Sequence, residues 1–123
     1  MSAAPARAAR LTARELIESI ADPDSYQSWD SPPVEPELGP EYAAELRAAA
    51  EKSGVDESII TGEARIDGRR VALIACEFAF LAGSIGLAAA ERFVEAMERA
   101  TAERPPVLAS TASGGTRMQE GTV

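Results

Sequence analysis

Two glycine-containing turns are the places where this sequence could stabilise a negative charge. One is Ser113-Gly114-Gly115, which follows the apolar run 107–109, and the other is Gly83-Ser84, which precedes a helical pattern. When a strand ends in glycines ahead of a helix N-terminus, free backbone N–H groups converge there, with the partial positive charge of the helix behind them. Such a spot can hold a phosphate, a carboxylate, or an oxygen that becomes negative during a reaction.

The elements around the 83–84 turn and the 113–115 turn must place them side by side. Pro105 and Pro106 exclude a helix, so the run 107–109 is predicted to be a buried parallel strand. Thr116 and Gln119 have the spacing of a capping box, which predicts that a helix opens there. A strand–helix–strand crossover makes two strands parallel, so both turns are expected on one edge of an α/β sheet, where ligands bind. Two neighbouring sets of N–H donors are the geometry that an oxyanion hole requires. The alternative, that the glycines only supply positive φ at tight turns, is left equally open.

A hairpin and a long helix are predicted upstream of the 113–115 turn. Strands over 59–66 and 69–78 are joined by Asp67-Gly68, a strong hairpin signal. The first strand alternates polar and apolar residues, which predicts one solvent-facing side, whereas the second is typical of a central strand covered on both sides. The helix is predicted over 85–103 and ends at Arg104-Pro105-Pro106. Its expected core stripe is Ala89, Phe93, Met97 and Ala100, and its expected solvated face carries Glu91, Arg92, Glu95, Glu98 and Arg99, with Glu95 and Arg99 spaced for an ion pair.

The N-terminal part is predicted to be an arm without chemistry. Residues 1–10 are expected to be disordered, and a short amphipathic helix is predicted over 11–21. Residues 25–40 hold four prolines, which favours an extended loop rather than helix or sheet. Within this loop Trp29 is interpreted as an anchor that pins the arm to the body, with a binding aromatic as the alternative. A second helix over 41–52 is closed by Ser53-Gly54. The expected division is a disordered 1–10, an arm over 11–55 that forms a helical appendage, and a truncated catalytic domain over 56–123.

Composition excludes several classes of function. The net charge of −8 argues against a nucleic-acid partner, and the lack of histidine excludes imidazole as a base or metal ligand. A single cysteine, Cys76, excludes an internal disulfide and fits a reducing cytosol; it is interpreted as a packed, inert thiol rather than a nucleophile. The longest apolar stretch is too short to span a membrane, and no targeting signal is present, so a cytoplasmic protein is expected.

Residues 68–121 resemble part of a known family. The sequence GRRVALIACEFAFLAGSIGLAAAERFVEAMERATAERPPVLASTASGGTRMQEG is similar to the N-terminal crotonase-type domain of acyl-CoA carboxylase carboxyltransferase β subunits, of the acetyl- and propionyl-CoA carboxylase type. The SGG(A/T)RMQEG motif, here Ser113 to Gly121, is its most specific part. The partner motif F-(M/L)-G-G-S-(M/I)-G lies at Phe80 to Gly86, with Ala82 in place of the first glycine. The match covers about residues 56–123, and the arm SWDSPP resembles that of zinc-free actinobacterial members. The implied fold is α/β: a partial crotonase-type fold of stacked ββα units behind an N-terminal helical arm.

The resemblance also implies a reaction and its residues. Family members move a carboxyl group from carboxybiotin, held on a separate carrier protein, to the α-carbon of an acyl-CoA, and the biotin ureido nitrogen takes the proton, so no side-chain base is needed. By this resemblance the backbone amides of Gly83, Ser84, Gly114 and Gly115 form the oxyanion hole. Ala82, Gly86, Ser113 and Thr116 are the implied substrate-binding residues. No zinc or other metal is expected, because the four-cysteine ribbon of many bacterial β subunits is absent. An Arg117–Glu120 ion pair that braces the turn is favoured over ligand contact.

The implied partners are acyl-CoA, a biotin carboxyl carrier or biotin carboxylase subunit, and a second carboxyltransferase half, in a homo- or hetero-oligomer without nucleic acid or membrane. Family members continue far beyond Val123, so the chain is expected to be an N-terminal fragment that is inactive alone. The intact enzyme would make malonyl-CoA for fatty-acid synthesis, or methylmalonyl-CoA; the extra methyl group of Ala82 favours acetyl-CoA over propionyl-CoA as substrate. A related acyl-CoA decarboxylase subunit and a non-catalytic remnant stay open as alternatives.

Overall fold

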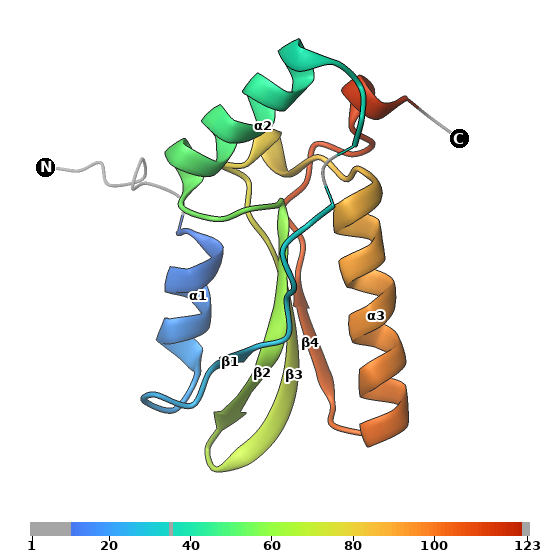
Figure 1. Cartoon of the computed structure of the whole chain (residues 1–123). Coiled ribbons are helices and arrows are strands. Elements are labelled where there is room, and N and C mark those ends of the chain that lie inside the picture. Colours follow the sequence, from blue (N-terminus) through green and yellow to red (C-terminus); the bar gives the residue numbers. More distant parts are fainter. Residues whose placement is uncertain (1–10, 35, 122–123) are drawn as a thin grey trace, which may run out of the picture.

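The structure, a computed structural model, describes residues 11–34 and 36–121, so the predicted disorder of residues 1–10 lies outside the described residues. A four-stranded sheet in the order β1-β2-β3-β4 forms its centre (Figure 1). The strands are β1 (Gln27–Ser28), β2 (Ile59–Ile66), β3 (Arg69–Cys76) and β4 (Val107–Ser110). The helices are α1 (Ala13–Ile20), α2 (Pro40–Ser53) and α3 (Leu87–Glu103). Figure 1 shows α1 and α3 on opposite faces of the sheet, with α2 across the edge at which β3 and β4 end.

The predicted hairpin and the predicted parallel crossover are both confirmed. β2 and β3 pair antiparallel around Asp67-Gly68, and both turn residues have positive φ, at 52° and 78°. The Asp22 carboxylate accepts hydrogen bonds from both turn amides, at 3.0 and 2.8 Å. β3 and β4 pair parallel, with α3 as the crossover helix. β3 ends at Cys76 rather than at the predicted Phe78, because the chain turns there into the loop that leads to the 83–84 turn.

The prediction that one side of β2 faces solvent is wrong. Thr61 is only 3% exposed, because Asp30 accepts hydrogen bonds from its N–H and its hydroxyl, at 3.0 and 2.7 Å. The segment 25–40 is also not entirely loop, since β1 adds an antiparallel edge strand opposite Gly62 and Glu63. Thr61 on β2 is therefore covered by the N-terminal arm, whereas Arg65 near the hairpin is exposed.

The helical appendage is also a wrong interpretation for α1, which belongs to the core. Its predicted existence is confirmed, and it begins with a capping box in which Thr12 and Glu15 bond each other's backbone N–H groups. Ala13 and Ile17 are buried in one core cluster with residues of the central strands, namely Ile60, Ala64, Leu73 and Ala75. The second predicted helix, α2, is confirmed, with Gly54 in the left-handed conformation at its C-terminus. The division at residue 56 stays an expectation.

α3 is rotated relative to the predicted core stripe. Ala89 and Ala100 are buried as expected, but Phe93 and Met97 are 44% and 37% exposed. The buried positions between them are Ala96 and Arg92. Arg92, expected in solvent, pairs with Asp56 at 2.9 Å and lies 3.5 Å from Asp30, and these two carboxylates allow its burial. The helix also begins at Leu87 rather than at Ile85.

The interpretation of Trp29 as an anchor for the arm is confirmed. Its Nε1 donates to Glu63 Oε1 at 3.1 Å, and the Arg99 guanidinium lies 4.3 Å from the ring centroid. Arg99 pairs with Glu103 at 2.9 Å, which is the i, i+4 partner on its C-terminal side instead of the predicted Glu95. Cys76 is a half-buried free thiol packed against a second core cluster, formed by Ile59, Ile74, Ala89 and Ala96, in agreement with an inert role.

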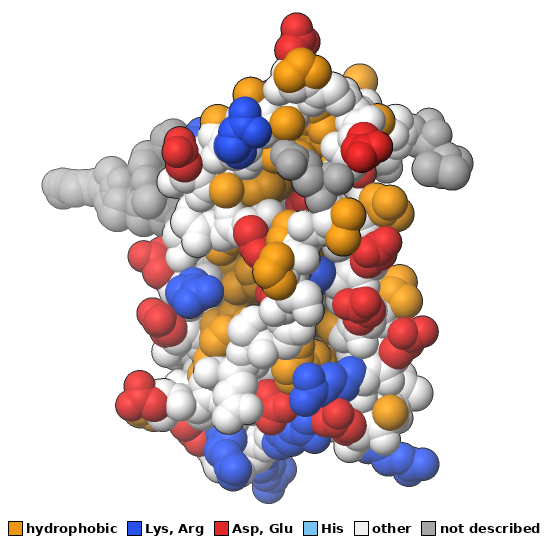
Figure 2. Space-filling model, in the orientation of Figure 1, with side chains coloured by type: hydrophobic (Ala, Val, Ile, Leu, Met, Phe, Trp, Pro, Cys, Tyr) orange, Lys and Arg blue, Asp and Glu red, His pale blue; other side chains and the backbone are white. Residues whose placement is uncertain are grey.

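Basic side chains gather at the hairpin end of the molecule in Figure 2, opposite the end at which β3 and β4 stop. Over residues 11–34 and 36–121, no helix has both the length and the apolar character that a membrane crossing requires.

Candidate functional site: two glycine turns at one edge of the sheet

The two glycine turns touch each other, as the sequence predicts. The Gly114 N–H donates to the Ala82 carbonyl oxygen at 2.8 Å. Ile85 and Thr116 form a parallel bridge, in which the Ile85 N–H donates to Gly115 at 2.8 Å and the Arg117 N–H donates to Ile85 at 2.9 Å. The two turns therefore form one rigid unit beyond the ends of β3 and β4.

The 83–84 turn has an unusual backbone. Leu81, Ala82 and Gly83 form a one-turn 3₁₀ segment, η2 (Leu81–Gly83), in which all three φ angles are positive, at 45°, 55° and 68°. Gly83 is required twice over: its φ is left-handed, and a Cβ there would lie under 3.0 Å from the Ala112 carbonyl oxygen. Ala82 carries a Cβ in the conformation that glycine favours, which is the physical reason for glycine at this position of the motif.

The four amides predicted as oxyanion donors all have acceptors within the chain. Gly83 donates to Phe80 at 2.8 Å, Ser84 to Leu81 at 3.1 Å, and Gly114 to Ala82. Gly115 donates to the Ser113 Oγ at 3.0 Å. Gly83 is buried, whereas Gly114 and Gly115 are exposed. Of the four, only the Gly115 N–H is bonded to a side chain, and the exposed Ser113 hydroxyl can rotate away from it. The Gly115 N–H is therefore the donor that the turn can offer most readily to a ligand.

The four predicted substrate-binding residues are divided between the surface and the interior. Ala82, Ser113 and Thr116 are exposed at the edge formed by the two turns. Gly86 is buried, and a Cβ on it would lie under 3.0 Å from the Glu120 carboxylate. Gly86 therefore serves as a surface for Glu120 to pack against.

The predicted helix after Thr116 is not formed within the described residues. The segment η3 (Met118–Glu120) is one 3₁₀ turn, and no side-chain hydrogen bond caps it. Instead, the Glu120 carboxylate turns back to α3 and accepts a hydrogen bond from the Leu87 N–H at 2.7 Å. A negative charge at a helix N-terminus is stabilising. The anion position at the start of α3 is thus filled by the chain's own carboxylate.

Arg117 is the centre of a buried polar network, which confirms the predicted bracing role. It is 0% exposed, and its guanidinium bonds Glu57 Oε1 and the Ser84 carbonyl oxygen, both at 2.6 Å. It also pairs with Glu120 at 3.3 Å. Burial alone would lower the pKa of Arg117, but hydrogen bonds to Glu57 and Tyr42 raise it, and the net shift is upward. The guanidinium is therefore a permanent cation that joins one glycine turn to the other.

Sequence reasoning missed Glu57 and Tyr42, the partners of Arg117 from distant segments. They lie 60 and 75 residues away along the chain, and neither belongs to a recognisable motif. Burial, and next the hydrogen bond to Glu120, raise the pKa of Tyr42 to about 12. For Glu120, burial acts to raise the pKa, but the Leu87 N–H, Tyr42 and Arg117 outweigh it, so the pKa is lowered. At neutral pH the phenol is thus neutral and the carboxylate charged.

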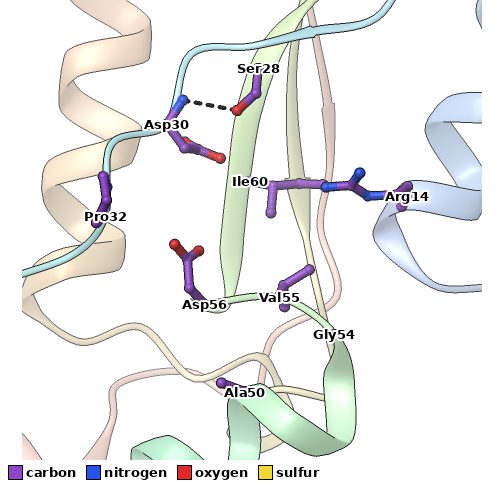
Figure 3. Close-up of a pocket in the computed structure, with 9 residues that line it drawn as sticks. All are labelled: Arg14, Ser28, Asp30, Pro32, Ala50, Gly54, Val55, Asp56 and Ile60. Carbon is purple, nitrogen blue, oxygen red and sulfur yellow. Dashed lines mark hydrogen bonds between the residues drawn. The ribbon is translucent and has the colours of Figure 1, made fainter.

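A cavity of about 500 Å³ lies away from the glycine turns, between α1, the segment 28–32 and the C-terminal end of α2. Figure 3 shows Asp30 and Asp56 on one side of it and Arg14 of α1 on the other. Both aspartates already pair with Arg92, and no lining residue belongs to a glycine turn. In the described part of the chain, no three His, Cys, Asp or Glu side chains cluster in a way that could hold a metal ion. The glycine turns are thus the stronger candidate site.

The chain is similar over most of its length to named carboxylase subunits. The chain is 59% identical over 114 residues to the protein of Mycobacterium tuberculosis named probable biotin-dependent acyl-coenzyme A carboxylase beta3 subunit, and the match covers 93% of the chain and 23% of the relative. It is 42% identical to the acetyl-coenzyme A carboxylase carboxyl transferase subunit beta of Desulfitobacterium hafniense, over 91% of the chain and 38% of that protein. The chain thus spans about a quarter to two fifths of the length of these relatives.

A solved structure confirms the crotonase-type fold. Transcarboxylase 12S, described as a hexamer with methylmalonyl-coenzyme A bound, superposes with a TM-score of 0.74 at 30% identity, over 91% of the chain and 21% of that protein. The family model for the carboxyl transferase domain matches residues 6–123. With this match over nearly its whole length, the chain belongs to the carboxyl transferase domain family.

Proposed function

We propose that this chain is part of a carboxyltransferase subunit of a biotin-dependent acyl-CoA carboxylase, which transfers a carboxyl group from carboxybiotin to a short acyl-CoA. The observation that carries the proposal is the contact between the two glycine turns, with the Gly115 N–H at an exposed edge of the sheet. Family membership supports the reaction type. The contact between the two turns supports placing the site at this edge of the sheet.

The chemistry needs hydrogen-bond donors more than it needs a base. When a proton leaves the α-carbon of a thioester, negative charge accumulates on the thioester oxygen, and a preorganised N–H donor at that oxygen is worth about 3 kcal/mol. We assign the Gly115 N–H this role; the neighbouring Gly114 N–H can add a second bond only after it leaves the Ala82 carbonyl oxygen, its acceptor at 2.8 Å. Biotin, when present on its carrier, supplies the carboxyl group and a basic nitrogen. The residues of this chain bind and orient the thioester.

Gly83 and Ser84 contribute to the proposed site by holding the two glycine turns together. Gly83 allows the turns to approach, and the Ser84 carbonyl oxygen accepts the Arg117 side chain at 2.6 Å. Their amides remain candidate donors, but each must first leave a backbone acceptor at 2.8 or 3.1 Å. The Gly115 N–H has no such cost, because its acceptor is the Ser113 hydroxyl, which can rotate away from it.

The proposal includes partners and a substrate preference. The enzyme would work in the cytoplasm without zinc, with biotin on a separate carrier protein, a second carboxyltransferase half and an oligomeric assembly. Acetyl-CoA, giving malonyl-CoA for fatty-acid synthesis, is favoured over propionyl-CoA because the exposed Ala82 adds a methyl group to the edge. One methylene in a binding pocket is worth about 1–3 kcal/mol, so the preference is expected to be modest.

A labelled-bicarbonate assay tests the proposal. The assembled enzyme that contains this chain is given ATP, labelled bicarbonate and its biotin carrier, and the acid-stable label on acetyl-CoA and propionyl-CoA is measured. Transfer to either substrate supports the proposal. Loss of CO₂ from malonyl-CoA without formation of carboxybiotin identifies a decarboxylase instead, and the absence of both reactions identifies a non-catalytic protein.

A further inference from the structure

We propose that Tyr42 of α2 is a positioning residue for the two glycine turns, acting through a hydroxyl group that holds both Arg117 and Glu120. The inference rests on the proposed function, because the turns are the part of the site that Tyr42 would position. It assigns a catalytic contribution to the N-terminal arm, which the sequence alone presents as a segment without chemistry.

The hydroxyl group of Tyr42 has two partners. It accepts a hydrogen bond from Arg117 Nη1 at 3.2 Å and donates one to Glu120 Oε2. The residue is 5% exposed, so water cannot replace the hydroxyl group readily. Tyr42 thus fixes the relative position of a buried cation and its carboxylate partner.

Those two side chains hold the 83–84 turn itself and the start of α3 that follows it. Arg117 bonds the Ser84 carbonyl oxygen at 2.6 Å and the Ser84 Oγ at 3.1 Å. Glu120 bonds the Leu87 N–H at 2.7 Å. Arg117 lies two residues after Gly115 in sequence, and its own N–H donates to the Ile85 carbonyl oxygen. The position of one turn relative to the other therefore depends on where Tyr42 places this pair.

The fold puts Tyr42 where it can do this. Figure 1 shows α2 lying across the edge at which β3 and β4 end, next to the segment that contains η3. A second contact, from Gln119 Nε2 to Glu45 Oε2 at 3.0 Å, joins the same two elements. That contact is exposed and involves neither Arg117 nor a glycine turn. Removing it weakens the docking of α2 without changing the Tyr42 hydroxyl group, so its effect can be compared with that of Tyr42→Phe.

The test compares three variants of the assembled enzyme in the labelled-bicarbonate assay. Tyr42→Phe removes only the hydroxyl oxygen. Tyr26→Phe is the matched control, since the Tyr26 hydroxyl also makes a hydrogen bond, to the Thr61 carbonyl oxygen at 3.0 Å, but contacts neither turn. Gln119→Ala removes the second contact between α2 and η3. We expect Tyr42→Phe to lower kcat about tenfold or more with KM for the acyl-CoA changed less than about twofold, because a misplaced donor is felt mainly in the transition state. The other two variants should keep kcat within about twofold.

A double variant shows whether the hydroxyl acts through the carboxylate. Glu120→Gln keeps an acceptor for the Leu87 N–H but removes the charge, and kcat should fall as it does in Tyr42→Phe. In the double variant the two losses should not add, because both break the same contact. Glu120→Gln also keeps the inference testable if Tyr42→Phe fails to assemble.

The outcomes separate this inference from the proposed function. An unsubstituted enzyme without carboxyl transfer contradicts the proposed function, and the inference with it. With an active enzyme, the inference alone is overturned if Tyr42→Phe keeps kcat, if it raises only KM, if it loses no more than Tyr26→Phe, or if its loss adds fully to that of Glu120→Gln.

Discussion

Replacing Gly83 by alanine should separate the two glycine turns. Gly83 has a φ of 68°, and a Cβ there would lie under 3.0 Å from the Ala112 carbonyl oxygen, with the Ser113 Cα at 3.1 Å. These are backbone atoms, so no flexible side chain can move aside. The 113–115 turn would have to shift, which would break the hydrogen bond from Gly114 to Ala82.

The expected loss of stability has two parts. The left-handed conformation costs alanine about 1–2 kcal/mol. Forcing a methyl group into a packed site adds about 1–3 kcal/mol. We therefore expect Gly83→Ala to lower the free energy of unfolding by about 2–5 kcal/mol, measured by urea unfolding followed by circular dichroism.

Gly54→Ala is the matched control for this measurement. Gly54 has a similar φ of 78°, and a Cβ there would meet nothing within 4 Å. It should therefore show the backbone cost of about 1–2 kcal/mol without the steric cost. An equal loss of stability in the two variants would refute the close contact between the turns.

Three further predictions concern the site and its surroundings. Gly115→Val should lower kcat for carboxyl transfer by about two orders of magnitude, by displacing one oxyanion donor, while assembly measured by gel filtration is unchanged; near-normal turnover contradicts the assignment. Ala82→Gly should relieve a φ of 55° and raise the free energy of unfolding by up to about 1 kcal/mol; the same variant should raise kcat/KM for propionyl-CoA relative to acetyl-CoA, and an unchanged ratio removes Ala82 from the pocket. The hydrogen bond from Arg70 lowers the pKa of Glu63 to about 2, from 4.5. Because the folded pKa is depressed, this pair stabilises the fold above about pH 4.5 and its contribution is lost as the pH falls towards 2. Glu63→Gln should therefore be less stable than the unsubstituted chain at pH 7 and equal to it near pH 2; a constant difference across this range contradicts the assignment.

The sequence predicts the features that depend on local signals. Asp67-Gly68 specifies a hairpin because both residues tolerate positive φ. A helix between two apolar strands specifies a parallel pair, and hence two turns at one edge. The contact between the 83–84 turn and the 113–115 turn follows from these two facts, which is why it could be predicted without the structure.

Features that depend on distant partners were beyond the sequence. Arg92 is buried because Asp30 and Asp56, from two other segments, neutralise it, and its burial rotates α3 so that Phe93 faces outward. No periodicity within the helix could reveal those carboxylates. Tyr42 was missed for the same reason, since its role depends on a residue 75 positions away.

The most direct test of the central claim is the infrared carbonyl stretch of a bound acyl-CoA labelled with ¹³C at the thioester carbon. If the Gly115 N–H donates to the thioester oxygen, the stretch should move to lower wavenumber when the substrate binds to the assembled enzyme. The shift should be lost in Gly115→Val and reduced in Tyr42→Phe. A bound thioester whose stretch equals that in water, or a shift that survives Gly115→Val, would contradict the placement of the oxyanion site at the 113–115 turn.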